Sequence, residues 1–555
     1  MKLARDPIDH KLALLHEEAE ERDAVRRAAS ENLPYLDLKK KPVDISALEL
    51  VSRSLAEEAR AVAFTLKGKK LALALYSSKL PNAEELIRRL EGQGFKLNIF
   101  ITSLSGLREA WNYYPVRTAP AESVVSVAQV ESQILEEAKN KIKSVADLAS
   151  YLQGRGEDMS TTDILKIIFS GALVLGVSDI HLEHVTRDRG LLRFRVDGIL
   201  RDIGRFSPKL IASIVSRLKL LSELKLNITD APQDGRFTIQ TESGPIEART
   251  SIVPAQFGEA AVLRILNPKV IAMELSDLGL RADDEEIVRK ELKRPNGMIL
   301  VTGPTGAGKT TTIYAFLKQI RTAAQKIITI EDPIEYHLEG IEQTQTEPRS
   351  GYTFATGLRS ILRQDPDIIL VGEIRDLETA QAAIHAALTG HLVFSTLHTN
   401  NAAGAIPRLI DLGVKPLVIG PALALVIAER LVRRLCLNCR REVIPDKTLK
   451  ENLEKFLQRL PKKVSRAKIE VRLFEAVGCK ECSDGYKAQI GLFEVLEMGA
   501  HLDALIKKGA VEEEITEEAK SAGMISMQED GLIKAINGVT TLQEVERATG
   551  PIEWG

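Results

Sequence analysis

An eight-residue glycine-rich run carries the clearest chemical signature in the chain. The pattern G-x-x-x-x-G-K-[ST] of a phosphate-binding loop is matched by Gly303-Pro304-Thr305-Gly306-Ala307-Gly308-Lys309-Thr310, which Thr311 follows. Glycines let backbone N–H groups turn toward phosphate oxygens where a side chain would collide. Lys309 can reach the β- and γ-phosphates, and the Thr310 hydroxyl can ligate Mg²⁺.

The segments around this run have the character that the loop requires. Met298–Thr302 has the apolar composition of a short buried strand, and Thr310–Ile320 that of a helix. The N-terminus of the helix adds a positive partial charge at the loop. The alternative is a glycine-rich turn that precedes a helix by chance. Strand, loop and helix in this order favour a nucleoside triphosphate site.

A strand downstream of the loop ends in three acids. The segment IITIEDPIE runs from Ile327 into Glu331, Asp332 and Glu335. Because ligands bind at the carboxyl ends of strands in α/β sheets, one acid can act as general base and others can hold Mg²⁺ through water. The alternative is that these are three surface acids that happen to follow a strand. The glycine-rich loop just upstream disfavours this alternative.

The next apolar strand, Ile368–Glu373 (IILVGE), is of the Walker B type. The position before its acid, often Asp in other P-loop enzymes, is Gly372, which leaves Glu373 as the carboxylate that positions water or lies beside the metal. His391 and His398 bracket the apolar strand that follows. A lone histidine is usually structural, but two around one strand suggest sensing of the γ-phosphate or coupling between subunits.

Arginines form the last group of candidates around the loop, because guanidinium matches phosphate oxygens in charge and geometry. Arg359 and Arg363 lie four residues apart and share a helix face, and Arg249 and Arg264 lie upstream of the loop. Single arginines are usually solvated surface groups. Residue type alone therefore does not select these four among the chain's 75 Lys and Arg.

All four cysteines form two C-x-x-C pairs in the last quarter of the chain: Cys436, Cys439, Cys479 and Cys482. Four thiolates at this spacing suit tetrahedral Zn²⁺. Four free core cysteines are the alternative, which their clustering disfavours. A redox pair is a further alternative, but neither C-x-x-C opens a thioredoxin-like helix. The spacing therefore predicts a structural zinc site.

Composition limits the class of protein. At 555 residues the chain is too long for one core, so we expect three or four domains. A net charge of −2 without a block of one sign disfavours nucleic acid as the main partner. The longest uncharged apolar run has twelve residues, Leu417–Ala428, whereas a membrane span needs about 20. The N-terminus has no signal-peptide core, and we expect a cytoplasmic protein.

Shifts in composition and punctuation by Pro and Gly predict an α/β multidomain chain. The predicted parts are a charged helical arm at 1–32, a first N-terminal α+β domain at 33–115, a linker and helix at 116–159, a second N-terminal domain at 160–268, a nucleotide-binding core at 269–433, a tetracysteine metal module at 434–498 and a helical C-terminal region at 499–555.

In this order, the motifs resemble those of the secretion ATPases of type II secretion and type IV pilus assembly. The glycine-rich loop matches the family's Walker A, and Glu331–Glu335, Ile368–Glu373 and Thr389–Asn400 match its Asp box, atypical Walker B and His box. Further matches flank the nucleotide site: SDIHLE at Ser178–Glu183, RFRVDG at Arg193–Gly198, QDGRF at Gln233–Phe237, RTSIVP at Arg249–Pro254, GLFEVLEM at Gly491–Met498 and MQEDGLIKAINGVTTLQEV at Met527–Val545.

The resemblance implies a RecA-like core behind a PAS-like domain, and a homohexamer that binds ATP and Mg²⁺. It gives Glu335 the catalytic role of the Asp-box glutamate and makes Glu373 the Walker B glutamate. It also makes the four arginines phosphate ligands, two of them from the preceding domain. In this family, hydrolysis opens and closes each subunit at the inner face of the cytoplasmic membrane. An inner-membrane platform protein takes up that motion and moves pilins.

Two departures from the family pattern concern the region after the core. The family often has A-Q-R-L where this chain has Ala428-Glu429-Arg430-Leu431, and G-Y-x-G-R where it has Gly485-Tyr486-Lys487-Ala488-Gln489. The first N-terminal domain also lacks the R-L-G…L pattern of relatives that bind cyclic di-GMP, so we do not predict that ligand. We expect a pilus-assembly ATPase. The alternatives are a type II secretion ATPase, a nucleic-acid translocase and a regulatory nucleotide-binding protein without turnover.

Overall fold

The computed structural model describes residues 7–554, apart from 42, 49, 112–113, 115–126, 154–158, 243, 268–271 and 465–470. Part of the predicted linker therefore lies outside the described residues. The chain divides into two compact units, which are described separately below. One unit holds Met1–Arg195 and Leu200–Ile265, and the other holds Val196–Ile199 and Leu266–Gly555. The mixed α/β multidomain class predicted from the sequence is confirmed.

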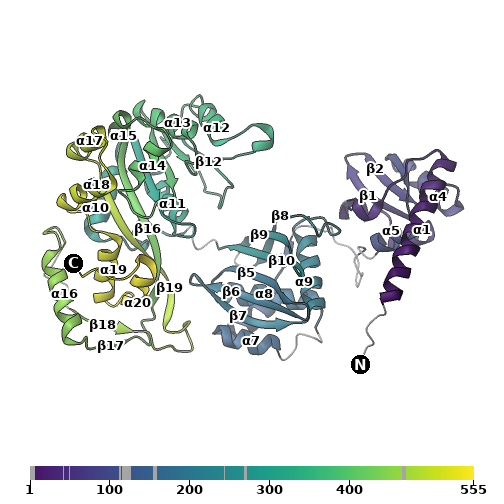
Figure 1. Ribbon diagram of the computed structural model, residues 1–555, viewed down its shortest axis with the longest axis horizontal. Helices are drawn as coiled ribbons and strands as arrows, with labels where there is room; N and C mark the ends of the chain where they lie inside the picture. Colours follow the sequence, from purple (N-terminus) through teal and green to yellow (C-terminus); the bar gives the residue numbers. More distant parts are fainter. Residues whose placement is uncertain are drawn as a thin grey trace. The chain divides into compact units, whose positions relative to one another are not determined.

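The first N-terminal domain is a three-stranded sheet with helices. Its elements are α1 (Pro7–Glu31), α2 (Ile45–Leu48), α3 (Arg53–Glu58), β1 (Ala61–Lys67), β2 (Lys70–Leu75), α4 (Pro81–Gly92), β3 (Lys96–Ile101) and α5 (Leu104–Trp111). Strand β2 lies in the centre, antiparallel to β1 and parallel to β3. Helix α1, predicted as a solvated arm that packs one weak stripe, lies against β3 and α5 (Figure 1). The Tyr35 hydroxyl donates to Glu21 of α1 over 2.6 Å, which ties the helix to this domain.

The second N-terminal domain has a seven-stranded sheet in the order β4-β8-β9-β10-β5-β6-β7. Its elements are β4 (Val127–Gln129), α6 (Ser132–Lys141), α7 (Val145–Gln153), α8 (Thr161–Val174), β5 (Val177–Thr186), β6 (Arg189–Val196), β7 (Ile199–Phe206), α9 (Pro208–Leu221), β8 (Gln233–Thr241), β9 (Gly244–Ala255) and β10 (Gly258–Leu266). Ser160 caps α8 by accepting from the Asp163 amide. Burial alternates residue by residue along β6, as its sequence predicts.

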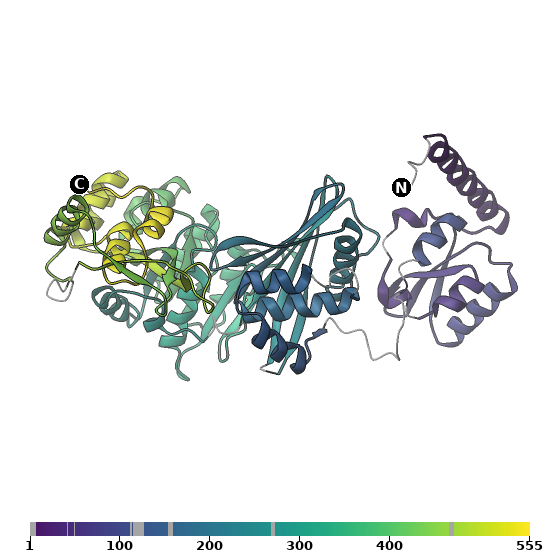
Figure 2. The ribbon, with the colours of Figure 1, turned by 90° about the horizontal axis from the view of Figure 1, so that it is seen from below.

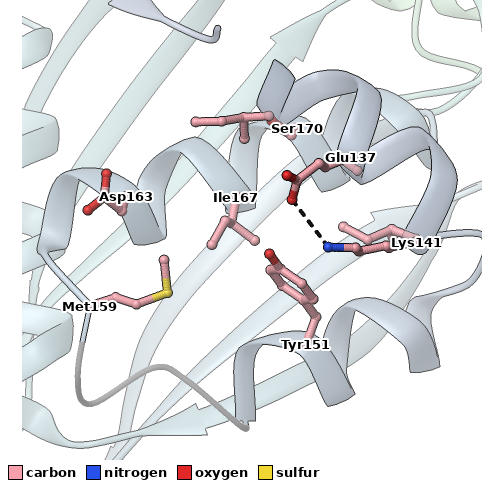
Figure 3. A pocket seen from close by; sticks show the side chains of 10 residues that line it. Glu137, Lys141, Tyr151, Met159, Asp163, Ile167 and Ser170 are labelled. Carbon is pink, nitrogen blue, oxygen red and sulfur yellow. Dashed lines mark hydrogen bonds and ion pairs between the residues drawn. The ribbon is translucent and has the colours of Figure 1, made fainter. Parts of the chain in front are cut away.

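Helices α6, α7 and α8 pack together beside this sheet (Figure 2). A cavity of about 210 Å³ lies among them, and the ion pair Lys141–Glu137 lies at its wall (Figure 3). The buried Ser170 hydroxyl on α8 also lines this cavity. None of the residues predicted to bind nucleotide or metal lines it.

The nucleotide-binding core has a seven-stranded sheet in the order β13-β12-β14-β15-β11-β16-β19. Its strands are β11 (Gly297–Thr302), β12 (Ile327–Glu331), β13 (Glu342–Gln345), β14 (Ile368–Val371), β15 (Leu392–Leu397), β16 (Leu423–Leu435) and β19 (Tyr486–Glu497). The first six pair in parallel, and β19 is antiparallel to β16. The carboxyl ends of the parallel strands therefore lie along one edge of the sheet.

Helices cover both faces of this sheet, which is why its central strands are continuous apolar runs. Its flanking helices are α10 (Ala282–Glu291), α11 (Lys309–Ile320), α12 (Phe354–Ile361), α13 (Leu377–Leu388), α14 (Ala405–Asp411) and α15 (Pro416–Ala422). Along the fully buried β11, Ile299 and Val301 pack in the core that includes α11. Met298 and Leu300 pack in the opposite core, with α12 and α13.

The C-terminal part continues from the long strand β16 and its partner β19. It holds β17 (Arg441–Val443), α16 (Lys447–Arg459), β18 (Leu473–Glu475), α17 (Ala500–Lys507), α18 (Glu512–Ser521), α19 (Met527–Ile536) and α20 (Leu542–Thr549). Helix α19 packs on β19, and α20 on β16 (Figure 1). Within the described residues, no helix combines the length and apolar character needed to cross a membrane.

A substitution of Phe394 tests the packing of the core without changing a residue of the glycine-rich loop. The Phe394 side chain is fully buried in β15, with its ring centroid 6.4 Å from that of Phe316 on α11. We expect Phe394→Ala to lower the free energy of unfolding by about 3–5 kcal/mol, because it removes a buried aromatic ring and leaves a cavity.

The matched control is Leu417→Ala, since the Leu417 side chain is 65% exposed. Urea unfolding of the full chain, followed by circular dichroism, measures both variants. Equal midpoints for Phe394→Ala and wild type would contradict the packing described here.

Candidate functional site

The glycine-rich loop joins the end of β11 to the start of α11. Gly303, Gly306 and Gly308 have φ values of 149°, 79° and 108°, in the region that side chains disfavour. A Cβ at Gly303 would lie 2.4 Å from the carbonyl oxygen of Glu429 on β16. The loop therefore requires glycine for its conformation and for its contact with the neighbouring strand. The predicted strand–loop–helix unit is confirmed.

Lys309 folds back over the loop. Its Nζ donates to the carbonyl oxygens of Gly303 at 2.7 Å and Pro304 at 3.0 Å. Burial lowers the pKa of Lys309, while the charges of Glu429 and Glu373 oppose that shift. A phosphate oxygen at the loop would be a stronger, charged acceptor than these carbonyls. The lysine is thus held where it can transfer its hydrogen bonds to a phosphate.

The threonines around the loop differ in their surroundings. Thr310 is exposed and Thr311 half-buried in the first turn of α11, so Thr310 can present its hydroxyl to a cation. The buried Thr302 hydroxyl lies 2.7 Å from that of Thr399, and the Thr399 amide donates to it over 2.9 Å. These bonds fix the end of β11 beside the segment that follows β15.

The three acids at and after the end of β12 differ in their surroundings. Glu331 is buried and accepts hydrogen bonds from Tyr314 at 2.5 Å, Thr329 at 2.6 Å and Gln343 at 3.1 Å. Burial and the Glu331 charge both raise the pKa of the Tyr314 hydroxyl, which keeps it a donor. Asp332 is exposed and Glu335 half-buried. The protein's own donors thus occupy Glu331, whereas the other two carboxylates lie nearer to solvent.

Glu373 lies at the same edge of the sheet, just after β14. Its side chain is 13% exposed, with Oε1 2.5 Å from Arg375 Nη2 and Oε2 3.5 Å from His398 Nε2. The preceding Gly372 lies against β12, where a Cβ would come within 3.3 Å of the Ile330 carbonyl oxygen. A side chain at this position would therefore be in tight contact with the backbone of β12.

The two predicted histidines lie at opposite ends of β15. His398 follows its carboxyl end, beside Glu373. His391 precedes its amino end, where the imidazole Nδ1 lies 3.0 Å from the Ala386 carbonyl oxygen and the Gly297 amide donates to the His391 carbonyl. Six strand residues separate the two ends, about 20 Å at 3.3 Å per residue. The structure therefore does not bring His391 to the phosphate-binding loop.

The four predicted arginines fall in both units. Arg359 on α12 pairs with Glu378 in the first turn of α13 at 2.7 Å. Arg363, just beyond α12, donates to the Arg359 carbonyl oxygen over 2.9 Å. Arg249 on β9 and Arg264 on β10 belong to the other unit. Only the first two are therefore described within the same unit as the loop.

Glu429 is a residue near the loop that the sequence reasoning did not assign to the site. It lies on β16, is 2% exposed, and accepts from the Thr312 hydroxyl of α11 at 2.8 Å. Burial raises its pKa to about 8, which the Thr312 hydrogen bond and the charges of Lys309 and Lys534 oppose. The signal that could have identified it is an acid directly after the apolar run Leu423–Ala428, at a position where the family often has Gln.

The four cysteines converge after β16 and before β19. Their Sγ atoms all lie within 4.8 Å of one another. The separations are 3.9 Å for Cys436–Cys479, 3.7 Å for Cys439–Cys482 and 3.6 Å for Cys479–Cys482. Four sulfurs at ~2.3 Å from one tetrahedral metal ion lie ~3.8 Å apart. The cluster thus has the size and donor set of a metal site.

Two protein families match the chain. Residues 155–547 match the family described as Type II/IV secretion system protein. Residues 31–120 match the MshEN domain, a range close to the first N-terminal domain predicted from the sequence.

Curated relatives extend the comparison. The Type II secretion system ATPase E of Vibrio cholerae is 42% identical over 394 residues, which is 71% of this chain and 76% of that protein. The Type IV pilus assembly ATPase PilB of Myxococcus xanthus is 35% identical over 522 residues, which is 94% of this chain and 89% of that protein.

Solved structures support the fold alone. The ATPase DotB of Yersinia pseudotuberculosis is similar with a TM-score of 0.51 and 20% identity, over 70% of this chain and 92% of that one. DotB of Legionella pneumophila has a TM-score of 0.50 and 21% identity, over 69% of this chain and 95% of that one. On the family match and these identities, the chain belongs to the Type II/IV secretion system protein family.

Proposed function

We propose that this protein hydrolyses ATP to drive the assembly of type IV pili through an inner-membrane platform protein. The observation that carries the proposal is the meeting of the glycine-rich loop, Glu373 and His398 at one edge of the sheet. Similarity to a pilus-assembly ATPase over 94% of the chain supports the pilus reading. A type II secretion ATPase is the second candidate, because such a relative matches 71% of the chain.

The residues divide the work of hydrolysis by their positions. The loop from Gly303 to Thr310, together with Thr311, binds the triphosphate, and Lys309 donates to its β- and γ-oxygens. The exposed Thr310 hydroxyl fits a Mg²⁺ ligand, and Asp332 can bind the ion through water. Magnesium, when bound, offsets phosphate charge. Glu331 supports this edge of the sheet, since three protein donors occupy its carboxylate.

Two carboxylates can handle the attacking water. Glu335 is the general base in our proposal, and Glu373 orients the water, with His398 beside it. Arg359 and Arg363 supply positive charge from α12, and Arg249 and Arg264 from the preceding domain. Arginines from a separate domain complete a site only when the domains close, which would link hydrolysis to movement. His391 has no part in this proposal.

The proposal also covers the oligomeric state of the protein and its partners. The active form is a homohexamer at the inner face of the cytoplasmic membrane, held there by the platform protein, and it acts on pilins only indirectly. No direct nucleic-acid contact is expected, because the chain carries a net charge of −2.

Replacing Glu373 by Gln tests the hydrolytic site. The amide keeps the shape of the side chain but loses the charge that positions water, so we expect ATP binding within about twofold of wild type. Phosphate release should fall by about 10²-fold or more. Fluorescent-nucleotide titration and a phosphate-release assay measure the two effects.

Glu497→Gln is the matched control, because Glu497 is the last residue of β19 and pairs with Lys290 on α10. It should hydrolyse ATP like wild type. Turnover at the wild-type rate in Glu373→Gln would overturn the assignment of that residue.

The partner is tested by stimulation of turnover. We expect the cytoplasmic domain of a pilus platform protein to raise the ATPase rate several-fold. Single-stranded DNA, and the corresponding domain of a type II secretion platform, should have no effect. Stimulation by DNA alone would instead support a translocase, and stimulation by the type II domain alone would support the second candidate.

We further propose that the cysteine cluster holds one structural Zn²⁺. The sulfur separations fit a single tetrahedral ion, and the donor set is the one zinc prefers in closed structural sites. Such an ion would tie the turn after β16 to the turn before β19.

Cys479→Ser should lower the zinc content from about one ion per chain to a small fraction of that value, because the cluster loses one thiolate. It should also lower the unfolding temperature. Elemental analysis and thermal denaturation measure these changes, with Asn438→Ser, between two of the cysteines, as the control. Purified wild-type protein that contains no zinc would contradict the proposal.

A further inference from the structure

Glu429 on β16 contacts the phosphate-binding loop with both its backbone and its side chain. Strand β16 pairs with β11 up to Ala428, the partner of Thr302, so the next residue lies under the turn of the loop. Its carbonyl oxygen packs on Gly303, as described above. Its carboxyl Oε1 would lie 2.2 Å from a Cβ at Gly308, and Oε2 accepts from Thr312. The carboxyl group therefore lies against Gly308, the residue that directly precedes α11.

Few charges are placed to stabilise an ionised Glu429. Lys309 faces it from α11 but already donates to the Gly303 and Pro304 carbonyls. Lys534 faces it from α19, and its Nζ is already 2.5 Å from Asp530, a carboxylate on the same helix.

The neighbouring strands add no cation in contact with this carboxyl. On β16 itself, Arg430 donates to Asn400. On β19, the nearest acid is Glu494, in register with Ala428, and it accepts from the Ala402 amide at 2.7 Å. Burial therefore outweighs the favourable contacts, and the pKa of Glu429 is raised to about 8.

A charge on this carboxyl would oppose nucleotide binding in two ways. It would place a buried negative charge beside Gly308, where the loop amides and the helix N-terminus attract phosphate. It would also attract the Lys309 ammonium away from the phosphate oxygens. A neutral carboxyl does neither, and still accepts from Thr312.

We propose that Glu429 is a positioning residue whose carboxyl must stay protonated for tight nucleotide binding, so that nucleotide affinity falls as pH rises through weakly alkaline values. The inference rests on the proposed function, since it assumes that the loop binds nucleotide.

The sign follows from linkage. Below about pH 8 the carboxyl is neutral and the loop binds at full affinity. Bound phosphate raises the pKa of Glu429 further, because like charges disfavour its ionised form. Above about pH 8 the Glu429 carboxyl of the nucleotide-free protein is ionised. Nucleotide binding must then add a proton to this carboxyl, which weakens the binding. Between pH 7 and pH 9 the dissociation constant should rise about tenfold from this group alone.

The experiment is calorimetric titration of the full chain with ADP and Mg²⁺ at pH 7, 8 and 9. We expect Glu429→Gln to bind ADP at pH 7 like wild type, because the amide mimics the neutral carboxyl. The ratio of the wild-type to the Glu429→Gln dissociation constant should then rise about tenfold by pH 9. Using a ratio removes the titration of the nucleotide, which both proteins share.

Glu494→Gln is the matched control, a buried acid on the adjacent strand that should keep the wild-type pH profile. A second measurement needs no variant. In buffers of different ionisation enthalpy, ADP binding to wild type at pH 8 should take up about half a proton.

Three results would overturn the inference. Parallel pH profiles for wild type and Glu429→Gln, with binding intact, overturn it and leave the proposed function standing. Loss of ADP binding by Glu429→Gln at pH 7 also overturns it, since the amide would then fail to replace a neutral carboxyl. Absence of ADP binding in every protein, wild type included, overturns the proposed function as well.

Discussion

The contact of β16 with the loop at Gly303 is the constraint on which the nucleotide site depends. Two parallel strands, β11 and β16, run side by side, but only β11 turns away at its end, while β16 continues beneath the turn. A side chain at Gly303 would collide with the backbone of β16. Glycine at this position lets the loop turn back against the sheet before α11 begins.

The same edge of the sheet collects the remaining chemistry because the strands are parallel. The strands β12, β14 and β15 are neighbours, and an acid or a histidine lies at or just after the end of each: Glu331, Glu373 and His398. These acidic residues differ in how deeply they are buried, and the difference suggests different roles. Glu331 is enclosed by donors, Glu373 is mostly covered but in contact with exposed groups, and Glu429 is fully enclosed beneath the loop.

Local pattern was sufficient to predict the loop, its flanking strand and helix, and the cysteine cluster, because spacing along the chain sets those features. It did not distinguish the two histidines from each other. His391 and His398 flank one strand in sequence, but a strand separates its two ends in space. Nor could the pattern locate Glu429, whose contact with the loop depends on β16 pairing with β11 over a long separation in the chain. The sequence predicted that the solvated arm packs one weak stripe but, for the same reason, could not say that this stripe meets β3 and α5.

The central claim is that the loop is the place where ATP is cleaved. The most direct measurement is phosphate release from Mg-ATP by the purified full chain and by Lys309→Ala, each assayed with the platform domain that stimulates it. The account predicts turnover in wild type and a loss of at least about 10²-fold in the variant, because no other group described at the loop can replace the ammonium. Equal turnover by the two proteins would contradict it.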